Sequence, residues 1–401
     1  MKIIRLITAC FILLLITISI LSCRKKQDNT SSEAEMTTPI NISDLETTYG
    51  KLSSFVKEIE MISLEFTDES ILSEIKKIVI SDDYVFVMEK SNQKGIYVFN
   101  RKGNFLYRIG TRGQGPKEFI DLSDFSLNEE EKLVYLYDLQ RKKILTFSFQ
   151  NQFVGEVQMN YFADKFEYQN GLFYLYRENP SFGDPLYSLV VKDKNGKTVG
   201  KYYPSLNDSP LIHKCIFRKT EKNILFAQHM NDSIFSLTNE RMNPIYYIDY
   251  GAKKMSLEDR EDIRKDIRPA INVLLEKKTI AGITDVFEIN DKVFIKFVNV
   301  IIPMFCVYDK TTKETNVFQY FLDDLLFIAT NHPIGQYKDC LISILDQDDL
   351  QSAIDVGFNS WIDEGVLNME KADRLRMMIE EKFPNRNTGE NNPVVFLLKV
   401  S

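Results

Sequence analysis

Histidine and glycine are scarce in this 401-residue sequence, which contains three histidines and 17 glycines. The histidines, His213, His229 and His332, are isolated from one another and show no spacing of the kind by which paired histidines bind zinc. No G-x-S-x-G motif occurs either. A zinc centre and a Ser-His-Asp triad are therefore both poorly supported.

Cysteine is also sparse, and no C-x-x-C pair occurs among the five cysteines. Cys215, Cys306 and Cys340 are far apart and have apolar neighbours, which predicts buried small side chains rather than a disulfide framework.

The formal charge is −7 and becomes −9 without the first 22 residues, which contain Lys2 and Arg5. An acidic body argues against nucleic acid as a partner.

The only long apolar run, residues 7–21, follows the two basic residues and predicts a signal peptide over residues 1–22. It ends in Ile20-Leu21-Ser22-Cys23, which resembles the lipobox of bacterial lipoproteins. The resemblance implies lipidation of Cys23, a membrane anchor, and a place in the cell envelope, with the outer membrane favoured. An ordinary signal peptide and an N-terminal anchor helix remain alternatives. Residues 23–56 are expected to form a polar, flexible tether.

What the sequence has in abundance is short apolar strands rich in Phe and Tyr. Each strand of the type 84-YVFVME or 133-LVYLYD follows another strand and a polar turn, and two more strands with a tight turn come after it. Six such four-stranded units predict an all-β, six-bladed β-propeller over residues 57–401. A pair of β-sandwiches and a β-solenoid are the competing folds.

The first and last strands of this region are expected to belong to the same blade. The sixth unit has strands at 325–330, 340–345 and 393–400 but lacks a fourth, while the strand over 57–66 has no unit of its own. Placing the N-terminal strand at the outer edge of the sixth blade closes the ring and removes an exposed edge.

Two segments break the strand pattern and predict helical insertions. Residues 256–279 begin with Ser256 as an N-cap, and Pro269 should divide the helix. Residues 348–383 end in a helix with Leu375, Met378, Ile379 and Phe383 on one side. Both apolar stripes are expected to pack on the blades.

The segment 110-GTRGQGPKEF is rich in glycine but lacks two features of a phosphate-binding loop. No Ser or Thr follows its lysine, and no helix is expected after it. We therefore do not expect it to bind phosphate. Instead, residues 105–147 resemble the NHL/TolB-like propeller repeat, in which a Gly-rich turn ending in G-P-x-E-F joins two blades. In that family, the second strand of the next blade ends in Asp and is followed by a basic residue and an aliphatic one. Asp138, Arg141 and Ile144 occupy these positions here. The family usually has a glycine after the Pro of the G-P-x-E-F motif, where this sequence has Lys117. The whole chain resembles six-bladed β-propeller lipoproteins of Bacteroidota, which have no settled activity.

The propeller topology predicts that this loop and both helical insertions gather on one face of the ring. Candidate ligand-binding residues on that face are Arg112, Gln114, Glu118, Arg141, Arg177 and His229, although solvated loop charges or loop-stabilising ion pairs explain each of them as well. Within the loop, Gly113 and Gly115 are expected to need a positive φ.

Together these features favour a lipid-anchored envelope protein that binds a glycan, a peptide or another envelope protein. No catalytic residue and no cofactor is predicted. The alternative is a calcium-dependent enzyme similar to propeller lactonases and lyases, in which Asn, Asp and Glu from several blades hold the metal. A purely structural subunit of an outer-membrane complex is a third possibility.

Overall fold

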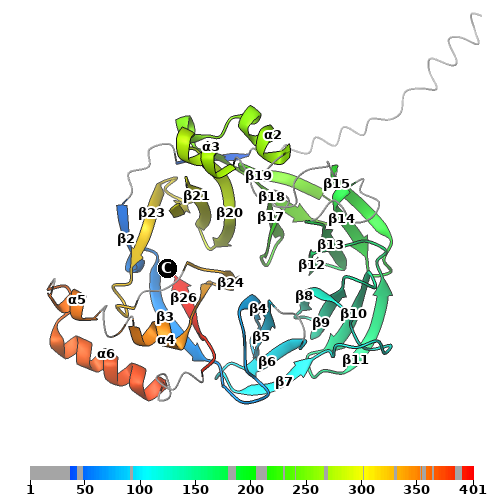
Figure 1. Ribbon diagram of the computed structural model, residues 1–401, viewed down its shortest axis with the longest axis horizontal. Coiled ribbons are helices and arrows are strands. Elements are labelled where there is room, and N and C mark those ends of the chain that lie inside the picture. Colours follow the sequence, from blue (N-terminus) through cyan, green and yellow to red (C-terminus); the bar gives the residue numbers. More distant parts are fainter. Residues whose placement is uncertain are drawn as a thin grey trace, which may run out of the picture. The chain divides into compact units, whose positions relative to one another are not determined.

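A computed structural model describes the chain in residues 37–42, 48–90, 94–178, 187–204, 215–228, 231–239, 241–265, 270–300, 302–328, 332–352, 354, 358–363, 365–383 and 391–401. The predicted signal peptide and Cys23 lie outside these residues. Residues 37–401 form one compact unit. Six sheets surround a central axis in it, as Figure 1 shows. The predicted six-bladed propeller is confirmed.

Blades 1 to 3 are consecutive four-stranded antiparallel sheets. Blade 1 contains β4 (Ile75–Ile80), β5 (Tyr84–Glu89), β6 (Ile96–Asn100) and β7 (Phe105–Ile109). Blade 2 contains β8 (Leu122–Asn128), β9 (Leu133–Asp138), β10 (Lys143–Ser148) and β11 (Phe153–Gln158). Blade 3 contains β12 (Lys165–Gln169), β13 (Leu172–Tyr176), β14 (Tyr187–Asp193) and β15 (Thr198–Pro204). In each blade the first strand is the innermost and the last forms the rim.

Blades 4 and 5 follow the same order. Blade 4 contains β16 (Cys215–Lys219), β17 (Ile224–Gln228), β18 (Ser233–Thr238) and β19 (Arg241–Asp249). Blade 5 contains β20 (Ile280–Ile289), β21 (Lys292–Asn299), β22 (Ile302–Asp309) and β23 (Thr315–Leu322). Their facing sides bury aliphatic and aromatic residues such as Leu225, Val293 and Ile295. These strands are apolar on both faces, as in the runs ILFA of β17 and VFI of β21, because each sheet packs face to face with a neighbour on either side.

Blade 6 combines both ends of the propeller. Its order is β24 (Gly335–Tyr337), β25 (Cys340–Leu345), β26 (Val394–Val400) and β3 (Val56–Ser63), so the predicted closure by an N-terminal strand is confirmed. The inner strand differs from the expected 325–330. There the Asp323 carboxylate accepts hydrogen bonds from the backbone N–H groups of Leu325, Leu326 and Ile328, which turns the chain instead of extending it.

The segment expected to be tether contributes two further strands. β1 (Thr38–Asn41) pairs in parallel with β19, and β2 (Thr48–Lys51) pairs in parallel with β23. The Ile40 side chain is buried in the core between blades 4 and 5. We call β1 and β2 together the strap. The propeller unit therefore begins near residue 37, because these short segments cover the outer edges of blades 4 and 5.

Both predicted helical insertions are present. α2 (Leu257–Lys265) and α3 (Ala270–Lys277) follow blade 4, and the Ser256 hydroxyl accepts the Asp259 N–H as the expected N-cap. This pair buries a small core of its own around Met255 and Ile263. α4 (Gln347–Ser352), α5 (Phe358–Asp363) and α6 (Met369–Lys382) interrupt blade 6. Ile379 and Phe383 join the main core with blades 5 and 6, and Leu375 packs against it, as expected. Met378, predicted on the same side, is instead 37 % exposed.

Candidate functional site

The innermost strands of all six blades line a cavity of about 1410 Å³ along the ring axis. Besides the strands, its walls include the short turns that join first to second strands, at residues 129–131, 220–223 and 337–339. Lys194 and Lys310, from turns between third and fourth strands, also contribute. The cavity therefore opens among the short turns, on the face opposite the between-blade loops.

Charged side chains of both signs line this cavity in equal numbers, nine of each. The cationic residues are Lys76, Lys77, Lys165, Lys194, Arg218, Lys219, Lys222, Lys310 and Lys338. The anionic residues are Asp124, Glu129, Glu130, Glu131, Glu167, Glu221, Asp285, Glu288 and Asp339. A cavity with this composition suits a polar ligand that carries both charges.

Repeated β-bulges aim several of these charges at the axis. The pairing register shifts between Ile75 and Lys77 in blade 1, between Leu122 and Asp124 in blade 2, and between Ile283 and Asp285 in blade 5. A bulge adds one residue to a strand and redirects the side chain that follows. As a result the inner strands of these blades direct a charged residue into the channel at similar positions.

Lys77 joins three blades at the centre of the channel. Its Nζ lies 3.0 Å from Asp124 Oδ1 and 3.3 Å from Glu167 Oε2, and it donates to the Phe125 carbonyl oxygen at 2.7 Å. Burial alone would lower the pKa of Lys77, but the two carboxylates outweigh it and raise that pKa. The Ser126 hydroxyl also donates to Glu167. This network fixes blades 1, 2 and 3 to one another through charge.

A second ion pair joins blades 4 and 5. The Arg218 guanidinium binds Asp285 through two nitrogens, with Nε–Oδ1 at 2.9 Å and Nη2–Oδ2 at 2.7 Å. The Asp285 Oδ1 atom also accepts the N–H of Val286. Parallel bonds of this kind are geometrically specific and strong. The inner strands are therefore held at fixed distances on both sides of the channel.

Long side chains also cross the channel between blades that are not neighbours. Lys219 of blade 4 donates to the Leu127 carbonyl oxygen of blade 2 at 2.8 Å, and burial lowers the pKa of its amine. Gln336 of blade 6 donates to the Lys219 carbonyl oxygen at 3.3 Å. Between the neighbouring blades 3 and 4, Gln169 donates to the Thr220 carbonyl oxygen at 3.0 Å. Each of these bonds to a carbonyl can be exchanged for a bond to a ligand.

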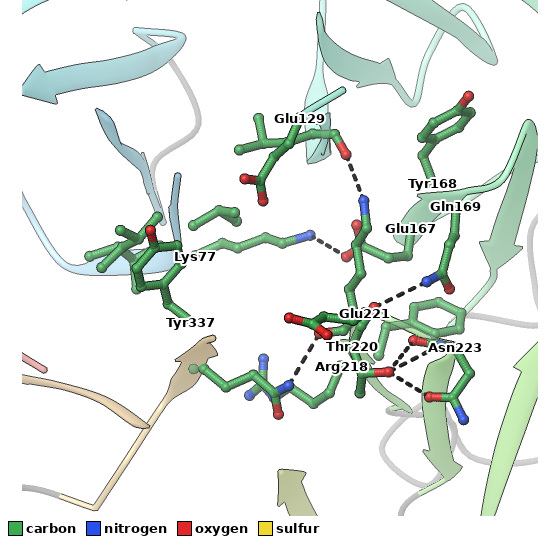
Figure 2. Close-up of a pocket in the computed structure, with 18 of the residues that line it drawn as sticks. Lys77, Glu129, Glu167, Tyr168, Gln169, Arg218, Thr220, Glu221, Asn223 and Tyr337 are labelled. Carbon is green, nitrogen blue, oxygen red and sulfur yellow. Dashed lines mark hydrogen bonds and ion pairs between the residues drawn. The ribbon is translucent and has the colours of Figure 1, made fainter. Parts of the chain in front are cut away.

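Two glutamates project into the cavity in Figure 2, Glu129 from blade 2 and Glu221 from blade 4. Neither makes a hydrogen bond or an ion pair with another part of the described chain, whereas Asp124, Glu167 and Asp285 all do. Desolvation by the cavity walls raises the pKa of Glu129. The mouth of the cavity therefore offers carboxylates that are available to a ligand.

The channel residues do not fit a calcium ion. Calcium prefers six to eight oxygen ligands from carboxylates, carbonyls and water. Here the Lys77 ammonium already occupies the space between Asp124 and Glu167, and Arg218 covers Asp285. Within the described residues, no group of three or more His, Cys, Asp or Glu is arranged to hold a metal. The cation at this position is a side chain of the protein itself.

The 110–119 loop is a rigid junction between blades 1 and 2. The Arg141 guanidinium donates to three carbonyl oxygens of the loop, those of Gln114, Gly115 and Glu118. The Glu118 carboxylate accepts the Gly115 N–H at 2.7 Å. The predicted residues Arg141, Gln114 and Glu118 are thus brought together, and these hydrogen bonds stabilise the loop itself.

The glycines of this loop do not all act as expected. Gly110 has a φ of 78°, whereas Gly113 and Gly115 do not adopt a positive φ. At Gly113, a Cβ would lie 2.0 Å from Glu118 Oε2, so a larger residue there would displace the Glu118 carboxylate from its bond to the loop. The sequence showed that small residues were needed but not that a carboxylate would fill the space beside them.

The remaining predicted residues are dispersed. Arg112 is exposed near the rim of blade 1 and donates to the Ile120 carbonyl oxygen at 3.3 Å. Arg177 is only 2 % exposed, so it lies inside blade 3. His229 lies outside the described residues. None of the five predicted residues that the structure describes lines the channel cavity, whose residues come from inner strands and give no compact motif in the sequence.

Comparisons with known proteins identify the family. Residues 38–399 match the domain of unknown function DUF4934. The chain belongs to this family. The matched region begins and ends with the propeller unit and includes the strap, which supports treating β1 and β2 as part of the domain. No curated protein matches the sequence.

One solved structure supports the fold of this DUF4934 chain. It is a protein of Bacteroides fragilis described as exported, similar with a TM-score of 0.70, 17% identity, and coverage of 91% of this chain and 100% of that one. An identity this low relates the folds alone. A DUF4221 family member from Bacteroides vulgatus also matches, with a TM-score of 0.46 and 9% identity over 86% of this chain and 98% of that one.

In the part of this DUF4934 chain that the structure describes, no helix is both long and apolar enough to span a membrane.

Proposed function

We propose that this protein is a lipid-anchored cell-envelope module that binds a short peptide or peptide-like molecule in the channel of its propeller. The observation that carries the proposal is the channel cavity of about 1410 Å³, with nine cationic and nine anionic side chains contributed by all six blades. A rigid ring whose inner strands converge on one polar cavity is a common arrangement for ligand binding.

A peptide suits this cavity better than a neutral glycan. Its amide groups can replace the bonds that Gln169, Lys219 and Gln336 make to carbonyl oxygens across the channel. Its amino groups can pair with Glu129 and Glu221, which have no ionic partner within the described chain. Because the lining charges balance, ligands with charges of both signs are favoured over strongly acidic or basic ones.

The proposed location in the cell envelope is based on the N-terminal sequence. The apolar run at residues 7–21 and the Ile20-Leu21-Ser22-Cys23 motif support export and lipidation at Cys23, and the outer membrane is the proposed location. The exported character of the Bacteroides fragilis protein with the same fold agrees with this address. The strap then joins the lipid-anchored end of the chain to the propeller.

Binding can be tested without knowing the ligand. Purified protein is denatured, and the small molecules released from it are identified by mass spectrometry. We expect peptides that rebind to the refolded protein, and at least tenfold weaker binding by the Glu129→Gln/Glu221→Gln variant. Glu74→Gln, a change at an exposed pair with Lys90 in blade 1, is the matched control. Equal binding by all three proteins would exclude the cavity as the site.

The anchor is tested separately by comparing the wild type with Cys23→Ser. The wild-type protein should partition with membranes and carry the mass of a lipidated cysteine, and the variant should do neither. Protease treatment of whole cells then shows whether the propeller faces the medium or the periplasm. A wild-type protein without added lipid would contradict the proposed anchor and leave the binding proposal standing.

A further inference from the structure

The rim strand of blade 1 has an unpaired edge beside a second cavity. β7 forms the end of its sheet, and no other described strand pairs with its outer side. Glu65 accepts the N–H of Phe105 at one end, and Asn151 accepts the N–H of Gly110 just beyond the other. Between these two side chains, residues 106–109 form a short open edge at the rim of the ring (Figure 1).

Positive charge surrounds this edge. The cavity beside it, of about 470 Å³, is lined by β7 together with Glu69, Lys94 and Arg112. Arg108 of β7 also lines it, so three cationic residues face one acidic residue. None of these four side chains forms an ion pair within the described chain. An acidic partner would therefore meet charges that the protein does not neutralise internally.

Arg112 is positioned by a rigid loop. Its Nε donates to the Ile120 carbonyl oxygen, and its backbone bridges to Phe119 in a parallel arrangement. The bonds from Arg141 to the same loop fix its shape. A cation on a prearranged loop loses little conformational freedom when it binds, which favours affinity.

The propeller itself shows that its rim strands accept an added parallel strand. β1 pairs with β19 of blade 4 and β2 pairs with β23 of blade 5. An exposed edge of this kind is a ready template for a strand from another chain. β7 differs from the two covered edges in its cationic border and in Leu106, which is 39 % exposed.

We propose that the edge of β7 binds an extended acidic segment of a partner protein, which pairs with residues 106–109 as a fifth strand of blade 1. Backbone hydrogen bonds hold the segment along the edge. Its carboxylates, spaced two residues apart, lie on the face of the sheet that carries Leu106 and Arg108, where they meet Arg108, Lys94 and Arg112. The apolar residues between them point to the opposite face, beside Tyr107. This surface is separate from the channel and does not depend on the ligand bound there.

The test uses a fluorescent eight-residue peptide of alternating Val and Glu, capped at both ends, with the Val–Lys peptide as its counterpart. Fluorescence anisotropy should show binding of the Val–Glu peptide, weakened by higher salt, and no binding of the Val–Lys peptide. Amide hydrogen exchange should slow in residues 106–109. The Arg108→Glu/Arg112→Glu variant should bind at least tenfold more weakly.

The matched control is Lys201→Glu, an equivalent charge reversal on the exposed rim strand of blade 3. It should leave binding unchanged. If the double variant fails to fold, Arg112→Ser alone replaces it, with at least threefold weaker binding expected. Unchanged exchange in residues 106–109, or an equal loss of binding in the control, would overturn the proposal.

Discussion

At the scale of single residues, Lys77 has the most consequential place in the propeller. Its ammonium neutralises Asp124 and Glu167, whose side chains are 7% and 8% exposed. Buried carboxylates without a cation are costly, because they lose hydration and gain nothing in return. One lysine therefore allows three inner strands to carry charge inside the ring.

Lys77→Met should destabilise the protein by about 3–5 kcal/mol, since it removes one partner from a buried ionic network. Urea denaturation followed by tryptophan and tyrosine fluorescence measures this loss. Lys90→Met is the control, because Lys90 and Glu74 form an exposed pair that should contribute about 0–1 kcal/mol. A loss in Lys77→Met no larger than in the control would mean that the network does not stabilise the ring.

Residue-scale features were also the hardest to anticipate from the sequence. Arg141 and Glu118 were predicted as ligand-binding candidates, but they form hydrogen bonds with the backbone of the 110–119 loop. Lys77 and Glu167 are far apart in the chain, and neither belongs to a recognisable sequence motif. They meet only because the propeller brings inner strands together around one axis.

At the scale of elements, the short turns are held by side chains that the sequence pattern did identify. The DKTTKE turn between β22 and β23 is an example. Asp309 accepts the backbone N–H groups of Thr312 and Thr311, at 3.0 and 2.8 Å, and binds Lys292 at 3.1 Å. These bonds favour the ionised carboxylate and lower the pKa of Asp309 to about 2.

A depressed pKa makes this turn sensitive to acid. The charged form stabilises the folded state above the ordinary pKa of 3.8, and that contribution is lost as the pH falls through about 2. Asp309→Asn keeps an acceptor oxygen but removes the charge. Its melting temperature should lie below that of the wild type at pH 6, and the two should converge near pH 2. A difference independent of pH would show that charge at this turn is unimportant.

The strap shows what the sequence could not reveal about elements. Four-stranded blades repeat, and repetition made both the blades and the closing strand predictable. β1 and β2 have only four residues each, occur once, and pair in parallel with strands about 200 to 270 positions away. Such segments lack the alternation and turn residues on which strand prediction depends.

At the scale of the whole molecule, blade 6 makes the propeller unit cooperative. Its strands come from both ends of the unit, so the blade cannot form until β26 meets β3. Phe396 of β26 is fully buried in the main core. Opening this blade therefore exposes the faces of blades 1 and 5 that pack against it.

Phe396→Ala should lower the free energy of unfolding of the whole unit by about 3–5 kcal/mol. Calorimetry should still show one transition, shifted to lower temperature, because no blade can lose its neighbour independently. Leu106→Ala, at a partly exposed position, is the control and should change stability by about 0.5 kcal/mol or less. A new, separate low-temperature transition in Phe396→Ala would contradict a cooperative ring.

The strap has a mechanical consequence if the proposed lipid anchor at Cys23 tethers the protein by its N-terminus. A pull on the chain ahead of Thr38 first loads the parallel pairing of β1 with β19 and then that of β2 with β23. Only after both have been peeled away does the force reach β3, the strand that closes the ring. Because the load is dissipated at the outer edges of blades 4 and 5, drag on the propeller can strain its attachment while the channel keeps its shape.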